Sequence, residues 1–143
     1  MTKILFVCHG NICRSPMAEY IMKDKLYHIS RTDIIVRSAA TSSEEIGNDI
    51  YWPAKQKLTE KSVPFGKHSA RRITKSDYED YDLLIGMDSK NVSNMVKFFG
   101  GDAEGKIRKL LDRDVYDPWY SGDFETAFTD IEEGIDKLLQ ELL

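Results

Sequence analysis

One short stretch near the start of the chain constrains the fold more than any other. Residues 4–7 (ILFV) form a short, wholly apolar run, which is typical of a strand buried on both faces of a parallel sheet. Ser15-Pro16 can open a helix, because proline is favoured in the first helical turn and apolar residues then recur at helical spacing as far as Leu26. Residues 8–14 are therefore predicted to join a buried strand directly to the helix that follows it.

The same pattern of strand and helix continues along the chain. The expected strands lie at residues 4–7, 34–37, 83–85 and within 107–111. The expected helices begin near Ser15, at Pro53, at a capping box in residues 74–77, after Asp88 or Ser89, and after Asp123. This alternation predicts a parallel sheet with right-handed crossovers and helices on both faces. No repeat or linker divides the chain, so we expect one domain over residues 1–143.

The composition excludes several classes of protein. A net charge of −4 and a pI of about 5.4 argue against nucleic-acid binding, and no apolar run approaches the roughly 18 residues that a membrane span needs. The first apolar run is too short for a signal peptide. Cys8 and Cys13, the two cysteines, are too few and too close for a secreted disulfide framework. We expect a cytoplasmic protein without nucleic-acid partners or membrane insertion.

The loop between the first strand and the first helix has the features of an anion site. Ligands in parallel α/β folds bind at the carboxyl ends of strands, beside helix N-termini. Gly10 allows a close turn, and Asn11 is among the few non-glycine residues that tolerate a left-handed conformation. Such a loop turns its N–H groups inward, the helix dipole adds positive potential, and Arg14 can hold two phosphate oxygens. The sequence therefore predicts a phosphate-binding loop.

Cys8 lies at the base of this predicted loop. Amides that bind phosphate also stabilise a thiolate, and a thiolate beneath a phosphate can attack phosphorus to form a phosphocysteine that water then hydrolyses. Ser15 could donate a hydrogen bond to the sulfur and ease its departure. A plain buried cysteine is the alternative, but Gly-Asn followed by Arg-Ser-Pro is a poor sequence for an ordinary turn. Cys13 fits either loop packing or a resolving partner for oxidised Cys8.

At this point the motifs resemble a known family. Residues 7–19 (VCHGNICRSPMAE) resemble the signature of the low-molecular-weight protein tyrosine phosphatases. The resemblance extends through residues 38–40 (SAA), 68–71 (HSAR), 86–88 (GMD) and 117–120 (DPWY), so it covers essentially the whole chain. It implies a three-layer, flavodoxin-like α/β fold whose four-stranded parallel twisted sheet has the order 2-1-3-4.

The resemblance also implies roles for individual residues. Cys8 is expected to be the nucleophile, Arg14 the phosphate clamp, and Asp117 the general acid that protonates the leaving phenolate, a contribution of typically about 10²–10⁴-fold. The remaining residues of the phosphate-binding loop are His9, Gly10, Asn11, Ile12, Cys13 and Ser15, with His9 expected to be a bystander. His68 matches a histidine that supports Asn11 and Ser15 by hydrogen bonds.

The substrate groove can be predicted from the same resemblance. Trp119 and Tyr120 match an aromatic pair that walls the groove and suits stacking on a phosphotyrosine ring. Where several family members carry an aromatic on the opposite wall, this chain has an acidic loop at residues 42–45 that includes Glu44, and we expect it to disfavour acidic sequences beside the phosphotyrosine. Substrates are expected to be phosphotyrosine proteins or peptides, with inorganic phosphate as product.

No cofactor or metal is expected, because Arg14 and the loop amides supply the charge stabilisation. A zinc site is disfavoured because the spacing of the cysteines and histidines matches no common ligand pattern. We expect a monomer or a weak dimer.

Three other functions share features with this phosphate-binding loop. A protein arginine phosphatase shares the fold and loop but carries a threonine where this chain has Ile12. A thioredoxin-coupled arsenate reductase needs a pair of cysteines far downstream, and none follows Cys13. A non-catalytic phosphopeptide-binding module would need neither Cys8 nor Asp117, and no Walker-type nucleotide loop occurs.

Overall fold

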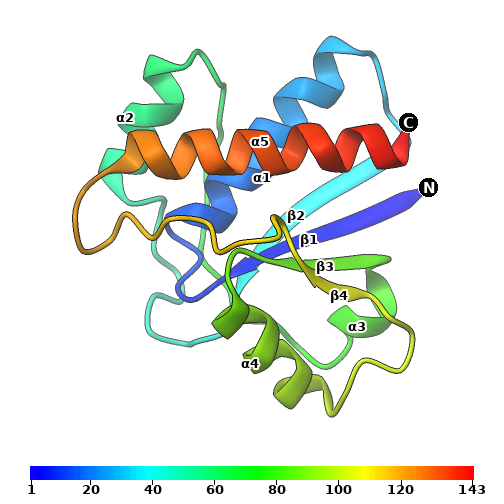
Figure 1. Cartoon of the computed structure of the whole chain (residues 1–143). Helices are drawn as coiled ribbons and strands as arrows, with labels where there is room; N and C mark the ends of the chain where they lie inside the picture. The colour runs from blue at the N-terminus through cyan, green and yellow to red at the C-terminus, as the bar shows by residue number, and fades with distance from the viewer.

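The computed structural model describes residues 1–143 and contains a four-stranded parallel sheet ordered β2-β1-β3-β4, which confirms the predicted topology (Figure 1). The strands are β1 (Thr2–Cys8), β2 (Ile34–Ala40), β3 (Leu83–Gly86) and β4 (Ile107–Lys109). The helices are α1 (Arg14–His28), α2 (Trp52–Glu60), α3 (Asp77–Asp80), α4 (Ser89–Phe99) and α5 (Phe124–Leu142). None of these helices is both long and apolar enough to cross a membrane.

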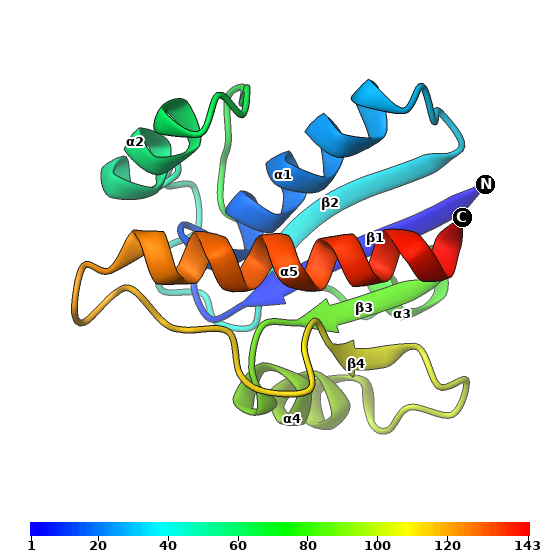
Figure 2. The same cartoon turned by 45° about the horizontal axis from the view of Figure 1, so that its top comes forward.

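The central strand β1 explains the layered arrangement. Its residues Ile4, Leu5, Phe6 and Val7 are all fully buried, as the unbroken apolar run predicts. Because side chains alternate along a strand, Ile4 and Phe6 join the larger core cluster with α1, α2 and α5, whereas Leu5 and Val7 join the smaller one. That smaller cluster includes Met95 of α4, and Figures 1 and 2 show α4 on the opposite side of the sheet from α1 and α5.

The start of α3 differs from the expected capping box. The Asp77 carboxylate does accept a hydrogen bond from the Thr74 N–H at 2.8 Å, but the Thr74 hydroxyl lies 3.1 Å from the Ser76 hydroxyl and caps no helical N–H. The box is therefore only half formed. Buried Asp77 is also held by the Arg71 guanidinium, at 3.0 and 3.1 Å, so it ties residue 71 to α3.

The last helix is capped and packed as its pattern predicts. Asp123 accepts a hydrogen bond from the Thr126 N–H at 3.0 Å, and a buried stripe runs along α5. Gly134 is needed for close packing, because a Cβ atom at this position would lie 2.4 Å from Cγ of Leu110. The glycine lets α5 approach the segment that follows β4.

The position of β1 in the sheet creates a crevice at the carboxyl ends of the strands. β1 pairs with β2 on one side and with β3 on the other, so the loops that follow all three parallel strands leave the same edge of the sheet. Crevices at such a point are where open α/β sheets bind ligands. The loop after Cys8, the loop after Ala40 and the start of α4 after Gly86 therefore meet at one edge.

Candidate active site

The loop from Cys8 to Arg14 has the predicted cradle shape. Asn11 has a left-handed backbone with φ of 60°, as expected, and its N–H donates to the Cys8 sulfur at 3.3 Å. The chain bends at Gly10, where a close turn is expected, and the missing side chain also has a second use. The φ of Gly10 is not positive, but an added Cβ would lie 3.2 Å from Cγ of Glu45, so Gly10 lets the loop at residues 41–48 approach.

Asn11 organises the loop through its buried side chain. Its Nδ2 donates to the hydroxyls of Ser15 and Ser38, each at 2.9 Å, and its Oδ1 accepts from the Arg71 N–H at 3.2 Å. His68 Nε2 lies 2.6 Å from the Asn11 carbonyl oxygen, and since a carbonyl can only accept, this nitrogen donates. His68 thus supports Asn11 as expected, but the expected direct bond to Ser15 is absent, and Asn11 makes that bond instead.

Ser15 connects this network to the sulfur. Its hydroxyl lies 3.0 Å from Cys8 Sγ, and because it already accepts from Asn11, its proton is available to the sulfur. Behind Asn11, the Ser38 hydroxyl donates to Glu19 at 2.6 Å. Ser38 and Glu19 lie within the family motifs, but the sequence did not reveal their hydrogen bonds. A network of side-chain hydrogen bonds from Glu19 and Ser38 through Asn11 to Ser15 therefore fixes the loop around Cys8.

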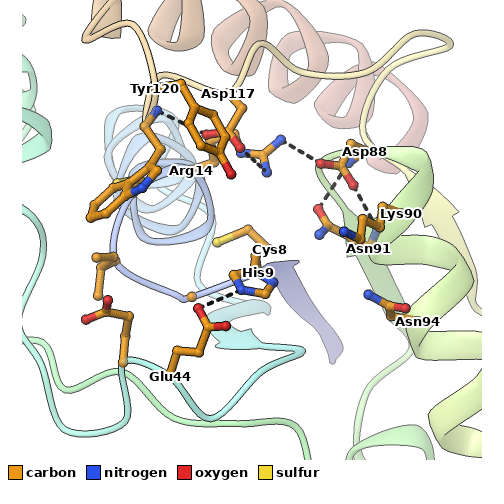
Figure 3. Close-up of a pocket in the computed structure, with 15 residues that line it drawn as sticks. Cys8, His9, Arg14, Glu44, Asp88, Lys90, Asn91, Asn94, Asp117 and Tyr120 are labelled. Carbon is orange, nitrogen blue, oxygen red and sulfur yellow. Dashed lines mark hydrogen bonds and ion pairs between the residues drawn. The ribbon is translucent and has the colours of Figure 1, made fainter.

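Arg14 is buried, with 4% of its side chain exposed, and is fixed from several sides (Figure 3). Nη1 lies 3.0 Å from Asp88 Oδ2 and donates to the Val115 carbonyl at 3.1 Å, while Nη2 lies 3.6 Å from Asp117 Oδ2. Burial by itself would lower the pKa of Arg14, but the charges on Cys8, Asp117 and Asp88 outweigh burial and raise it. The guanidinium therefore stays cationic beside the sulfur.

Asp117 lies in the loop before α5, at the mouth of the pocket. Its Oδ1 accepts a hydrogen bond from the Trp119 N–H at 3.1 Å, and 42% of its side chain is exposed. Only the family resemblance pointed to this residue. The fold brings its carboxylate next to Arg14, which lies at the other end of the chain.

Asp88 is a site residue that the sequence interpretation missed. It was expected only to cap a helix, and it does cap α4, accepting from the Asn91 N–H at 2.7 Å. It also pairs with Arg14. A usable signal was present, because Asp88 lies just beyond the carboxyl end of β3, the strand that neighbours the cysteine-bearing β1.

The pocket above Cys8 has a volume of about 380 Å³. It is lined by the loop residues Cys8, His9, Gly10, Ile12, Cys13 and Arg14, by Glu44, Glu45, Asp117, Trp119 and Tyr120, and by Asp88, Lys90, Asn91 and Asn94 from the start of α4. Glu44, Trp119 and Tyr120 thus surround the mouth. Trp119 packs on Tyr51 with ring centroids 4.9 Å apart, and Tyr120 is almost fully exposed.

His9 and Cys13 have different surroundings within the loop. His9 is expected to be a bystander, but its Nε2 lies 2.9 Å from Glu44 Oε2, so it ties the phosphate-binding loop to the acidic loop at residues 42–45. Cys13 is free and buried, and burial, followed by the charge on Cys8, raises the pKa of its thiol. Cys13 is therefore a protonated, packed thiol in this structure, and its role as a resolving partner stays a prediction.

These side chains can carry out one type of chemistry. The Cys8 thiol accepts a hydrogen bond from the Asn11 N–H in the loop before α1, with the Arg14 guanidinium beside it and the Asp117 carboxyl group at the mouth. A phosphate monoester bound by Arg14 and the loop would place phosphorus over the sulfur and its leaving oxygen near Asp117.

Known proteins similar to this chain are phosphatases, in agreement with the chemistry of the site. A family model described as low molecular weight phosphotyrosine protein phosphatase matches residues 3–143. The low-molecular-weight protein-tyrosine-phosphatase YfkJ of Bacillus subtilis is 35% identical over 147 residues, covering 97% of this chain and 94% of YfkJ. The crystal structure of YfkJ superposes with a TM-score of 0.95, covering 99% of this chain and 94% of that one.

Two further crystal structures share the fold. The low-molecular-weight tyrosine phosphatase SP-PTP of Streptococcus pyogenes is 35% identical with a TM-score of 0.93, covering 100% of this chain and 94% of that one. An arginine phosphatase from Drosophila is 29% identical with a TM-score of 0.90, covering 99% and 98%. Sequence and fold agree along the whole chain, and the chain belongs to the low-molecular-weight protein tyrosine phosphatases, a family of hydrolases with a cysteine nucleophile.

Proposed function

We propose that this chain hydrolyses phosphotyrosine in proteins or peptides through a phosphocysteine on Cys8. The observation that carries the proposal is the convergence of three groups in one pocket: the Cys8 sulfur, the Arg14 guanidinium and the Asp117 carboxylate. Each group has a distinct task in phosphoryl transfer, and each is held by hydrogen bonds or ion pairs within the chain.

In the first step the Cys8 thiolate attacks phosphorus in line with the phenolic oxygen. The S–P bond forms as the P–O bond breaks, and Asp117 in its protonated form gives its proton to the departing phenolate. Arg14 and the loop N–H groups stabilise the negative charge on the transferring oxygens.

In the second step water attacks the phosphocysteine. The Asp117 carboxylate takes a proton from the water, the S–P bond breaks, and inorganic phosphate leaves. The departing thiolate receives the hydrogen bond of the Ser15 hydroxyl, which lies 3.0 Å away. Cys8 returns to its starting state.

The lining of the pocket favours a phenolic ester. Ile12 from the loop and Trp119 and Tyr120 from the opposite side provide apolar and aromatic surface for a tyrosine ring. A second candidate activity is hydrolysis of phosphoarginine, since a similar protein bears the name arginine phosphatase. Ile12 supports the tyrosine assignment over this alternative.

Turnover of an aryl phosphate by the wild type, Cys8→Ser and Cys13→Ser tests the central claim. We expect Cys8→Ser to lose essentially all activity while staying folded by circular dichroism, and Cys13→Ser to keep measurable activity. Undiminished turnover by Cys8→Ser contradicts the proposal. Phosphotyrosine and phosphoarginine peptides, compared side by side, then separate the two activities, and faster turnover of phosphoarginine overturns the tyrosine assignment.

We also propose that the protein acts in the cytoplasm as a monomer or weak dimer. The two free cysteines support a reducing compartment. One chain supplies Cys8, Arg14 and Asp117, so the proposed chemistry needs no residue from a partner subunit. Sedimentation at micromolar concentration tests the second point, and a tight oligomer would contradict it.

A further inference from the structure

Unpaired positive charge gathers beside the active site. Most lysines and arginines of this acidic chain form an ion pair with a carboxylate. Seven form none, and three of these, Lys3, Arg37 and Lys67, lie elsewhere in the chain. The other four lie on α4 or on the segment that packs beside it: Arg72, Lys75, Lys90 and Lys97. Local positive charge that the chain does not neutralise is available to an outside anion.

Three residues of α4 place this charge on one face. Lys90, Asn94 and Lys97 are spaced by four and three residues, so their side chains share one face of the helix. Lys90 and Asn94 line the pocket above Cys8, and Figure 3 shows them across that pocket from Glu44. The face therefore begins at the site of chemistry.

The same face continues into a second hollow. Asn94 and Lys97 line a neighbouring depression of about 550 Å³, together with Thr41, Ser42, Ser43, Glu44, Arg72 and Phe98. Asn94 and Glu44 belong to both depressions, so the two are continuous. A peptide that leaves the active site toward Asn94 therefore enters a hollow lined by two unpaired cations, Arg72 and Lys97, and by one carboxylate, Glu44.

Arg72 is already positioned in that hollow. Its Nε donates to the Thr41 carbonyl at 3.1 Å, and its guanidinium lies 5.4 Å from the centroid of the Phe98 ring. Its two Nη groups make no hydrogen bond within the chain, and neither does the Lys97 ammonium. A cation held by its inner edge loses little side-chain freedom when an anion binds its outer edge.

We propose that Lys90, Lys97 and Arg72 form a docking track for anionic side chains that flank the phosphotyrosine of the substrate. Lys90 and Lys97 are separated by about 10 Å along the helix axis, which is about three residues of extended peptide. Lys90 lines the pocket that receives the phosphotyrosine. An anionic side chain that reaches Lys97 is therefore expected about three positions from the phosphotyrosine. The inference rests on the proposed function and adds a substrate preference to it.

The track refines the expectation drawn from the acidic loop. Glu44 and Glu45 stand on the wall opposite α4, so acidic residues directed over that loop are repelled while those directed along α4 are attracted. The pocket thus distinguishes the two flanks of its substrate by charge.

Three phosphotyrosine peptides test the track: one with neutral flanks, one with glutamates at positions −4 to −2, and one with glutamates at +2 to +4. We expect one acidic peptide to exceed the neutral one in kcat/KM by roughly three- to fivefold at low salt, the effect of one or two exposed ion pairs. The gain should shrink at high ionic strength. A fourth peptide, with phosphoserine at the favoured position, shows whether a second phosphate is preferred over a carboxylate.

Charge-changing variants test whether the higher kcat/KM on the acidic peptide depends on α4 and Arg72. In Lys97→Glu the ratio of acidic to neutral kcat/KM should fall to about one or below, because the attraction is lost. In Arg72→Gln the ratio should fall but stay above one. Lys137→Glu, which makes the same change of charge on an exposed part of α5, should leave the ratio at its wild-type value.

Two results overturn the track: neither acidic peptide exceeds the neutral one, or Lys97→Glu keeps the wild-type ratio. A wild type that hydrolyses no phosphotyrosine peptide at all overturns the proposed function itself, and the substrate role of the track with it. The two failures are distinct because the neutral peptide reports on the proposed function alone.

Discussion

The Ser15 hydroxyl lies 3.0 Å from the Cys8 sulfur and accepts a hydrogen bond from the Asn11 amide at 2.9 Å. The second contact uses an acceptor lone pair of the hydroxyl, so its proton is left to face the sulfur. A hydrogen bond of this kind stabilises a thiolate more than a phosphocysteine sulfur, because the thiolate carries the charge. Ser15 therefore acts where a thiolate must be formed as a leaving group.

We expect Ser15→Ala to slow hydrolysis of the phosphocysteine by roughly 10- to 100-fold, the worth of one hydrogen bond to a charged group. Rapid mixing with an aryl phosphate should then show a burst of phenol release followed by slow turnover. Ser15→Thr keeps the hydroxyl and should restore most of the rate. A variant that slows burst and turnover equally would contradict the assignment to the second step.

Asp117→Asn should affect substrates in proportion to the basicity of their leaving group. We expect kcat/KM to fall by about 10²–10⁴-fold for phenyl phosphate, whose leaving group needs a proton, and much less for an aryl phosphate with a weakly basic phenolate. Steady-state kinetics on a series of aryl phosphates measures this. Asp112→Asn, an exposed aspartate earlier in the same connection, is the matched control. An equal loss for all substrates would argue against proton donation.

Asp88 combines a helix cap with an ion pair, and two substitutions separate them. Asparagine is as good a cap as aspartate, so Asp88→Asn should lose only the pairing with Arg14, whereas Asp88→Ala should lose both. We expect urea unfolding to show about 2 kcal/mol of destabilisation for the asparagine variant and about 1 kcal/mol more for alanine. Equal stabilities of the two variants would show that the cap contributes nothing.

Gly134→Ala should destabilise the protein even though alanine is the better helix former. The intrinsic preference favours alanine by about 1 kcal/mol, but the new Cβ would lie 2.4 Å from Leu110 and force it to move. We expect a net loss of about 1–2 kcal/mol in thermal or urea unfolding. Combining it with Leu110→Ala, whose own cost is measured separately, should remove most of the conflict, and additivity of the two changes would contradict the packing explanation.

Burial of Cys13 predicts a dependence of stability on pH. Burial, and then the charge on Cys8, raises the pKa of the Cys13 thiol, so the unfolded state ionises first as the pH rises above the ordinary value of 9.0. The unfolded state then binds fewer protons, and stability falls with rising pH by up to about 1.4 kcal/mol per unit. The free energy of unfolding should therefore decline more steeply in the wild type than in Cys13→Ala above pH 9.0. Parallel curves would show that Cys13 ionises equally well in both states.

Local patterns in the sequence determined the elements and the heart of the site. An unbroken apolar run predicted the buried β1, the Asp123 and Asp88 caps predicted the starts of two helices, and Asn11 predicted the left-handed turn. Cys8 and Arg14 could be assigned because they lie in one short loop between a strand and a helix. Such features depend on neighbouring residues, so they can be read without knowing the fold.

Only the tertiary structure decided which distant residues reach that loop. Asp88 and Asp117 meet Arg14 because β1 lies beside β3 and the connection before α5 returns to the same edge of the sheet. Lys97 and Arg72 likewise become neighbours of one hollow only through packing of α4 on the sheet. Capping and apolar patterns carry no information on strand order or helix docking, and these non-local relations set the partners of the site.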